Sequence, residues 1–195
     1  MVIVVANVKG GVGKTTSAVY LAAAAAEDAL GPVILVDGDP QASASVWLEE
    51  RPLDGVTLVE APSERFLVRA VELGAGAMMV VDTPPGNERQ IRAALEHADV
   101  VVIASRVGAL EPDRVTATLA MVASGCPVGL VLTSTRPRTR DHRETMAAWI
   151  DAGIPVWGSV PERVAVAAGP DSPLNEDALT VYRQVLVHAK GMVRQ

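Results

Sequence analysis

The sequence is short of several kinds of residue, and each shortage excludes a class of protein. Its 195 residues include one cysteine, Cys126, which excludes a disulfide framework and any site that needs several cysteines from one chain. No apolar run approaches the ~18–20 residues of a membrane span, and the opening residues lack the basic region of a signal peptide. We therefore expect a cytoplasmic protein. The length fits a single domain over residues 1–195.

Aromatic residues and lysine are also scarce. Three Trp, two Tyr and one Phe leave Ala, Val, Leu and Ile to build the core. A net charge of −6 argues against a globally basic nucleic-acid binder, although a local basic patch remains possible. Most of the cations are arginines, yet Lys9 and Lys14 lie in one glycine-rich loop. A compact ammonium group suits a phosphate, so this loop is a candidate anion site.

Short apolar runs alternate with helical patterns along most of the chain. Such alternation predicts an α/β fold with a doubly wound, mostly parallel seven-stranded sheet and helices on both faces. The predicted strands are Val2–Val8, Val33–Asp37, Thr57–Glu60, Ala77–Asp82, Asp99–Ala104, Val128–Thr133 and Pro155–Val160. The predicted helices are Lys14–Leu30, Asn87–Ala98, Pro112–Ser124, His142–Ala152 and Asn175–Met192. Ligands of such sheets bind beyond the carboxyl ends of the strands.

The strongest motif is the segment VIVVANVKGGVGKTT, in which a buried strand runs into a glycine-rich loop and Lys-Thr-Thr opens a helix. Glycines let the backbone turn its N–H groups toward phosphate oxygens, and the helix N-terminus adds more donors. We expect Lys14 to reach the β- and γ-phosphates, Thr15 to bind Mg²⁺ and Thr16 to contact an inner phosphate. The predicted nucleotide-binding residues of this loop are Gly10, Gly11, Val12, Gly13, Lys14, Thr15 and Thr16.

Carboxylates follow two later strands. Asp37 and Asp39 belong to the segment VDGDPQ, and Asp82 ends the apolar run MMVV before a Thr-Pro-Pro-Gly turn. Because the carboxyl ends of parallel strands share one edge, we expect these groups near the loop. Asp82 is the predicted Mg²⁺ ligand, acting through water, and Asp39 holds the metal's water shell or orients the attacking water. Asp37 shapes the loop or the metal shell.

The loop K-G-G-x-G-K-T-T departs from the common phosphate-loop pattern, because Val8 replaces its first glycine and Lys9 follows. This form resembles the deviant Walker A loop of ParA/MinD-type ATPases. The resemblance implies that Lys9 is catalytic and crosses to a partner's nucleotide, so that ATP joins a sandwich homodimer. It also assigns the hydrolytic role to Asp39 and a γ-phosphate-sensing role to the turn after Asp82.

Two later segments resemble the adenine side of the same family. Pro161, Glu162 and Arg163 follow the last predicted strand and match a base-flanking loop. The segment Thr133–Arg136 lies at the end of the sixth predicted strand, where this superfamily also contacts the base, so Arg136 is a further candidate on the adenine side.

Within the family the chain is most similar to the small partition ATPases, since its phosphate loop begins at residue 9 and leaves no room for an N-terminal helix-turn-helix domain. The resemblance implies that the ATP dimer binds nonspecific DNA at the nucleoid. A ParB-like partner then stimulates hydrolysis and releases the DNA. The candidate DNA contacts are Arg136, Arg138, Arg140 and Arg143, which outweigh Asp141 to give +3 over ten residues. Arg183, Lys190 and Arg194 are further candidates.

Other functions remain open. A positioning ATPase for a protein cargo, such as a carboxysome or a chemoreceptor cluster, shares every motif. A MinD-like membrane ATPase is disfavoured because the tail VLVHAKGMVRQ lacks a basic and bulky amphipathic helix, so we expect no stable membrane association. A carboxylate-activating synthetase of the same superfamily is disfavoured because no polar set for an acceptor substrate stands out.

Overall fold

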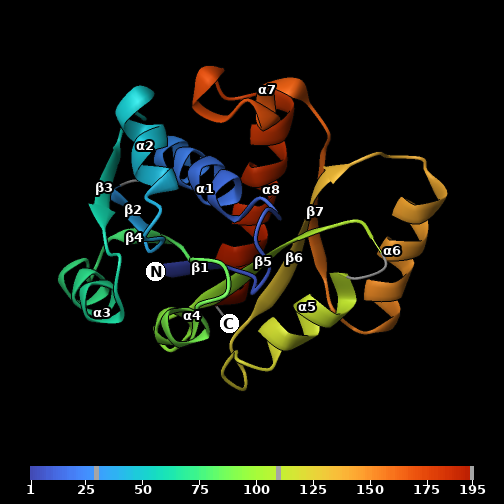
Figure 1. Cartoon of the computed structure of the whole chain (residues 1–195), viewed down its shortest axis with the longest axis horizontal. Helices are drawn as coiled ribbons and strands as arrows, with labels where there is room; N and C mark the ends of the chain where they lie inside the picture. The colour runs from blue at the N-terminus through green and yellow to red at the C-terminus, as the bar shows by residue number, and fades with distance from the viewer. Residues whose placement is uncertain (29–30, 109–110, 194–195) are drawn as a thin grey trace.

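The computed structural model describes residues 1–28, 31–108 and 111–193. Within them, seven strands form one sheet in the order β3-β2-β4-β1-β5-β6-β7, and every neighbouring pair is parallel (Figure 1). The predicted fold class is confirmed, and the sheet is wholly rather than mostly parallel. The strands are β1 Val2–Ala6, β2 Val33–Asp37, β3 Val56–Glu60, β4 Met78–Asp82, β5 Val100–Arg106, β6 Val128–Thr135 and β7 Val156–Pro161.

Helices cover both faces of the sheet, as expected (Figure 1). One layer contains α1 Lys14–Asp28, α2 Ser43–Glu50, α7 Val164–Ala167, the 3₁₀ turn η1 Gly169–Asp171 and α8 Glu176–Val193. The opposite layer contains α3 Glu64–Leu73, α4 Glu88–Leu95, α5 Glu111–Leu119 and α6 Arg140–Asp151. Successive side chains of β1 point to opposite faces of the sheet, so Ile3 packs in the core beneath one helix layer and Val4 in the core beneath the other.

The first layer is close-packed because α1 is rich in alanine. Its buried small side chains let α8 approach closely. The two helices are also joined by a buried hydrogen bond between Ser17 Oγ and Tyr182 Oη, which lie 2.7 Å apart. The Tyr20 and Tyr182 rings pack with centroids 5.4 Å apart. This packing fixes α1 firmly, so the loop before it starts from a rigid support.

Several predicted boundaries differ from the structure. The first strand ends at Ala6, two residues early, because Asn7 and Val8 already belong to the loop. The predicted helix from Pro112 ends at Leu119 instead of Ser124, where turns take over. The predicted end of the first helix, Leu30, lies outside the described residues. None of the described helices is both long and apolar enough to span a membrane.

Three helices were absent from the prediction: α2, α3 and the four-residue α7. Helix α3 buries only Leu67 and Val71, so charged neighbours hide its single apolar stripe. Helix α2 is short and follows a turn at Ala42 with φ of 54°.

Candidate functional site

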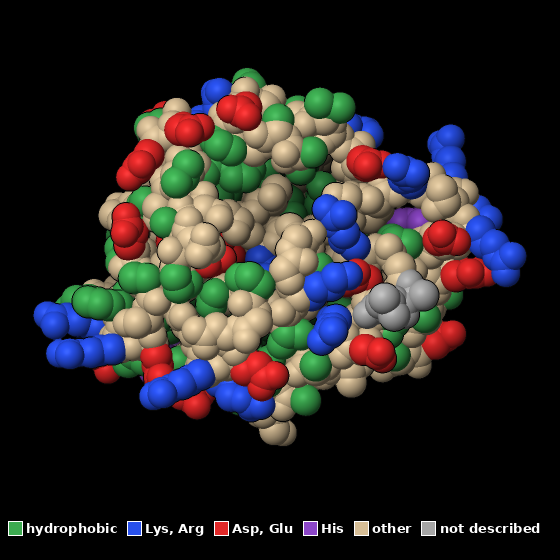
Figure 2. Space-filling view, viewed as in Figure 1, with side chains coloured by type: hydrophobic (Ala, Val, Ile, Leu, Met, Phe, Trp, Pro, Cys, Tyr) green, Lys and Arg blue, Asp and Glu red, His purple; other side chains and the backbone are tan. Residues whose placement is uncertain are grey.

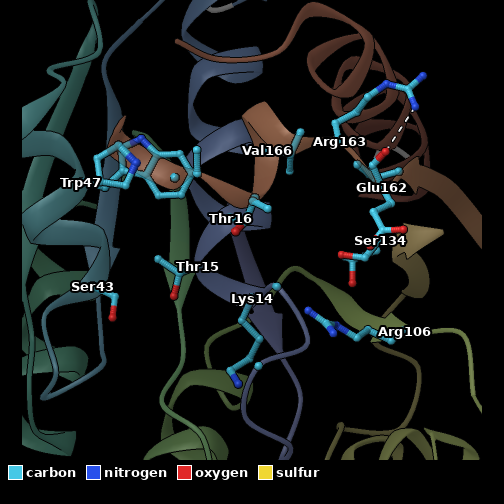
Figure 3. Close-up of a pocket in the computed structure, with 18 of the residues that line it drawn as sticks. Lys14, Thr15, Thr16, Ser43, Trp47, Arg106, Ser134, Glu162, Arg163 and Val166 are labelled. Atoms are coloured by element: carbon cyan, nitrogen blue, oxygen red, sulfur yellow. Dashed lines mark hydrogen bonds between the residues drawn. The ribbon is translucent and has the colours of Figure 1, made fainter. Parts of the chain in front are cut away.

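A cavity of about 750 Å³ opens at the carboxyl edge of the sheet. Its wall is built from the loop after β1, the start of α1, the loop after β2, α2, the ends of β5 and β6, and the segment from β7 to η1. Figure 2 shows the hollow near the centre of the molecule, and Figure 3 shows the side chains around it. The position is the one expected for a ligand of a parallel α/β sheet.

The glycine-rich loop wraps one end of this cavity. Gly11 and Gly13 have φ values of 71° and 85°, a region that favours glycine. A Cβ on Gly13 would lie 3.2 Å from Thr133 Cγ2, and the Thr133 hydroxyl donates to the Val12 carbonyl at 2.7 Å. Ser17 N donates to the Gly13 carbonyl at 2.9 Å, which begins α1 directly after the loop. The end of β6 therefore supports the loop from behind.

Lys14 lies at the cavity wall and is only 6% exposed. Its Nζ donates to the Lys9 carbonyl at 2.9 Å, so the side chain folds back along the loop. Burial lowers the pKa of Lys14, while Asp82 and then Asp39 act in the opposite direction by their negative charge. A partly desolvated ammonium beside open space is poised to bind an anion. Thr15 and Thr16 also line the cavity next to Lys14 (Figure 3).

Lys9 lies elsewhere, although it is only five residues from Lys14. Its side chain is outside the cavity wall formed by the described residues, and its Nζ lies 2.5 Å from Glu111 Oε1. Glu111 is 4% exposed at the start of α5. The two lysines of the loop therefore point to different places, one into the protomer's own cavity and the other away from it.

The three predicted carboxylates meet at the end of β2 and β4. Asp37 pairs in register with Asp82, and Asp39 lies at the cavity wall. Asp37 is saturated with hydrogen bonds, because it accepts from the backbone of Asp39 and from both the backbone and hydroxyl of Ser45. It therefore shapes the loop and holds the first turn of α2 in place. Asp39 accepts from Gln41 N at 2.9 Å.

Asp82 is fully buried, and in the described part of the chain neither of its carboxylate oxygens has a hydrogen-bond partner. Burial raises the pKa of Asp82 to about 7, and the nearby Thr15 hydroxyl lowers it in part. A buried orphan carboxylate beside a threonine hydroxyl and a lysine fits a site that a cation completes. No cluster of three or more His, Cys, Asp or Glu in the described ranges could hold a metal alone. Mg²⁺ needs no such cage, because phosphates and waters supply most of its ligands.

The segment after β2 is held tightly against the segment after β4. Gly38 N donates to the Asp82 carbonyl at 2.9 Å, and a Cβ on Gly38 would lie 2.6 Å from that same oxygen. The buried side chain of Gln90 on α4 donates to the Gly38 carbonyl at 2.6 Å and to the Ala61 carbonyl at 3.1 Å. Pro85 lines the cavity and faces Gly10, whose added Cβ would lie 3.4 Å from Pro85 Cβ. The two carboxylate-bearing loops thus form one connected wall.

The predicted base-side residues divide into two groups. Pro161, Glu162 and Arg163 line the cavity together with Ser134 (Figure 3). Arg136 lies outside the wall, where its Nε donates to Glu162 Oε2 at 2.7 Å. The structure therefore brings most of the predicted residues to one end of the cavity and leaves Arg136 on the rim.

Other lining residues were not predicted. Arg106 ends β5, and Ser43, Val46 and Trp47 come from the unpredicted α2. The only signal for Arg106 was its place at the end of an apolar strand, and a lone arginine there forms no motif. Trp47 had none, since its place depends on packing against Tyr20, with ring centroids 6.4 Å apart.

The predicted DNA contacts lie on the β6–α6 loop and the start of α6, and Figure 2 shows cationic side chains projecting over this edge. Arg140 pairs with Glu144, and the Arg143 guanidinium donates to the Arg138 carbonyl. The further candidates Arg183 and Lys190 lie on α8 and pair with Glu27 and Asp28 of α1, so their charge is already compensated. Arg194 lies outside the described residues.

Comparisons with known proteins identify the class to which this fold and site belong. A model of the CobQ/CobB/MinD/ParA nucleotide-binding domain matches residues 3–174. The chain belongs to this family, and it is therefore a nucleotide-binding ATPase of the ParA/MinD type. The predicted family and the predicted enzyme class are both confirmed. That residues 1–195 form a single domain stays a prediction.

Individual relatives fall into two groups. The chain is 37% identical over 161 residues to the maintenance of carboxysome distribution protein A of Gloeobacter kilaueensis, covering 80% of this chain and 74% of the relative. It is 29% identical over 167 residues to the protein ParA of Rhizobium radiobacter, covering 80% and 75%. A putative plasmid partition protein of Borrelia burgdorferi bound to AMPPNP has the same fold, with a TM-score of 0.78, 20% identity and coverage of 95% and 96%. Other solved structures of this fold hold Mg-ADP, or an ATP analogue with magnesium.

Proposed function

We propose that this ATPase works as a switch in which ATP joins two protomers face to face and hydrolysis separates them. The observation that carries the proposal is the divergence of the two loop lysines. Lys14 lies in its own cavity, whereas Lys9 points out of it toward Glu111. A cation that does not serve its own cavity is available to a nucleotide held by a facing protomer. Release of Lys9 from Glu111 would accompany pairing.

In this proposal each protomer binds its own nucleotide through the loop. Lys14 and the backbone of Gly10 to Gly13 grip the phosphates, while Thr16 contacts an inner phosphate. Thr15 and Asp82 hold the metal, which neutralises charge on the phosphate oxygens when bound. Asp39 orients the water that attacks the γ-phosphorus. Pro161, Glu162 and Arg163 flank the base.

The connection between the Asp37–Asp39 segment and the turn after Asp82 supports a two-state device. Gly38 and Gln90 tie the two segments together, so a shift at the γ-phosphate end would move Asp39 as well. Intrinsic turnover is expected to be slow, because the described cavity wall offers Asp39 as its only carboxylate without a hydrogen-bonded basic partner. A DNA-binding partner protein of the ParB type would accelerate it.

Sedimentation velocity tests this switch. The parent is expected to be monomeric with ADP and dimeric with ATP, and Lys9→Ala to remain monomeric with both nucleotides. Lys190→Ala is the matched control, because Lys190 is paired with Asp28 at the end of α1 that lies away from the glycine-rich loop. A Lys9→Ala protein that dimerises with ATP as fully as the parent would eliminate the role given to Lys9.

We further propose that the dimer binds DNA nonspecifically through Arg138, Arg140 and Arg143, with Arg136 at the rim, which would place the protein at the nucleoid. Exposed ion pairs such as Arg140–Glu144 contribute only about 0–1 kcal/mol, so a DNA phosphate can replace the carboxylate. Pairing doubles the number of contacts, which links DNA affinity to ATP through avidity.

Mobility-shift assays at several salt concentrations test the DNA patch. If a dimer makes about six phosphate contacts, a plot of the logarithm of the DNA association constant against the logarithm of the salt concentration should have a slope of about −5. In Arg138→Ala/Arg140→Ala/Arg143→Ala this slope should become much shallower and approach zero. The matched control removes three exposed arginines from α3 and α4, in Arg65→Ala/Arg69→Ala/Arg89→Ala. Loss of binding in the control alone would move the DNA site to that face.

The cargo has two candidates. DNA segregation is favoured by the similarity to ParA of Rhizobium radiobacter, and positioning of a protein body is favoured by the higher identity to the carboxysome distribution protein. Deleting the gene in its host separates them. A raised rate of plasmid or chromosome loss supports segregation, whereas unchanged DNA inheritance with clustered protein bodies supports a protein cargo. A MinD-like membrane role is disfavoured, because α8 buries most of its apolar side chains in the core that it shares with α1 and leaves only Val187, Met192 and Val193 exposed among its described large apolar residues.

A further inference from the structure

Arg106 is a cation in the cavity wall, and none of the roles proposed above involves it. It is the last residue of β5, and its guanidinium points into the cavity between Lys14 and Ser134 (Figure 3). Within residues 1–28, 31–108 and 111–193 its side chain makes no hydrogen bond or ion pair. Arg136, Arg163 and Arg183, by contrast, each lie beside a carboxylate. Glu162 lies near enough for the Arg106 charge to help lower the pKa of that carboxylate, but no hydrogen bond or ion pair holds the guanidinium, which is therefore available to a ligand.

The backbone of Arg106 is tied to the glycine-rich loop. Arg106 is in register with Thr133, and the Thr133 hydroxyl bridges the carbonyls of Ser105 and Val12 at 3.1 Å and 2.7 Å. The same threonine contacts the position where Gly13 would carry a Cβ. A guanidinium anchored at this point therefore lies beside the glycine-rich loop.

The charges around the cavity favour an anion there. Glu162 and Arg163 line the wall but are engaged with Arg136 and Asp177. Lys14 and Arg106 therefore remain as cations facing the space, against one carboxylate, Asp39. A planar guanidinium binds two phosphate oxygens at once, which an ammonium does not do.

We propose that Arg106 binds the phosphate chain of the nucleotide held in the same protomer, as a second cation facing Lys14. The inference rests on the proposed function only in requiring that a nucleotide fills this cavity. It assigns to the end of β5 a phosphate contact that the glycine-rich loop does not supply.

Titration calorimetry with ADP and with AMPPNP tests Arg106 in the full-length protein. Arg106→Gln is expected to weaken both ligands about tenfold or more, and Arg106→Lys to recover part of the loss. Arg114→Gln is the control, since Arg114 is an exposed residue of α5 outside the cavity wall, and it should bind like the parent. Equal thermal unfolding midpoints would show that the substituted proteins are folded.

The outcomes are distinct. If the parent binds neither nucleotide, the proposed function and this inference both fail. If the parent binds but Arg106→Gln binds equally well, only the inference fails. If nucleotide binding is unchanged while DNA binding falls in a mobility shift, the guanidinium serves DNA phosphates instead, and the inference is overturned.

Discussion

The buried carboxyl of Asp82 should destabilise the nucleotide-free protein at neutral and alkaline pH. Burial raises its pKa from 3.8 to about 7. A shift of about three units corresponds to about 4 kcal/mol of unfavourable free energy when the group is ionised in both states. Between pH 4 and pH 7 the folded protein holds a proton that the unfolded chain has released. Stability from this group is therefore complete below pH 4 and is lost as the pH rises through 7.

Asp82→Asn removes this titration. The amide keeps the shape of the side chain and has no charge, but burying it without partners costs about 1–3 kcal/mol. At pH 8 the variant should therefore exceed the parent by about 1–3 kcal/mol in the free energy of unfolding. At pH 5 the parent's penalty has fallen below 2 kcal/mol, so the two proteins should be nearly equal.

Urea denaturation at pH 5, 6 and 8, without nucleotide or Mg²⁺, measures these differences. Asp37→Asn is the comparison, because Asp37 accepts three hydrogen bonds and its replacement should destabilise by about 1–3 kcal/mol at pH 5, and by less at pH 8, where loss of its charge also eases the ionisation of Asp82. With saturating Mg-ATP the order should reverse, because the parent gains about 3 kcal/mol from a ligand at one hundred times its Kd and the variant does not. An Asp82→Asn protein less stable than the parent at pH 8 would refute the reasoning.

Other positions give simpler expectations. Gly38→Ala should lower the unfolding midpoint or prevent folding, because its Cβ would lie 2.6 Å from the Asp82 carbonyl oxygen, and an unchanged melt would contradict that contact. Gln90→Met should reduce kcat more than nucleotide affinity, because the Gly38 carbonyl loses its hydrogen-bond donor. Steady-state kinetics would measure kcat and calorimetry the affinity, and an equal loss of both would contradict this expectation. Tyr182→Phe should cost about 1 kcal/mol in urea denaturation by removing the bond to Ser17, whereas ATPase activity should persist.

Local sequence signals were sufficient where neighbouring residues decide the structure. The apolar strand, the glycines and the Lys-Thr-Thr segment lie within fifteen residues, so the position of the loop followed from the sequence, and the alternation of apolar runs with helical patterns indicated the fold class. Asp37, Asp39 and Asp82 were also placed correctly at one edge, because parallel strands end together.

Contacts between distant residues escaped prediction. Lys9 meets Glu111, and Gln90 meets Gly38, across separations that no local pattern encodes. Helix α3 was missed because its burial is confined to one narrow stripe, and Arg106 because a lone arginine at a strand end has no motif. The roles of these residues depend on the folded edge of the sheet.

The central claim, that Lys9 acts on the nucleotide of the facing protomer, is tested most directly by mixing two inactive variants. Lys9→Ala retains Asp39, and Asp39→Ala retains Lys9, so a mixed dimer contains one complete site. Lys9→Ala is expected not to pair with itself, so its protomers can dimerise only with Asp39→Ala protomers, and an equimolar mixture should regain up to roughly one half of the parental ATPase rate. A mixture no more active than the two variants measured separately would contradict the claim.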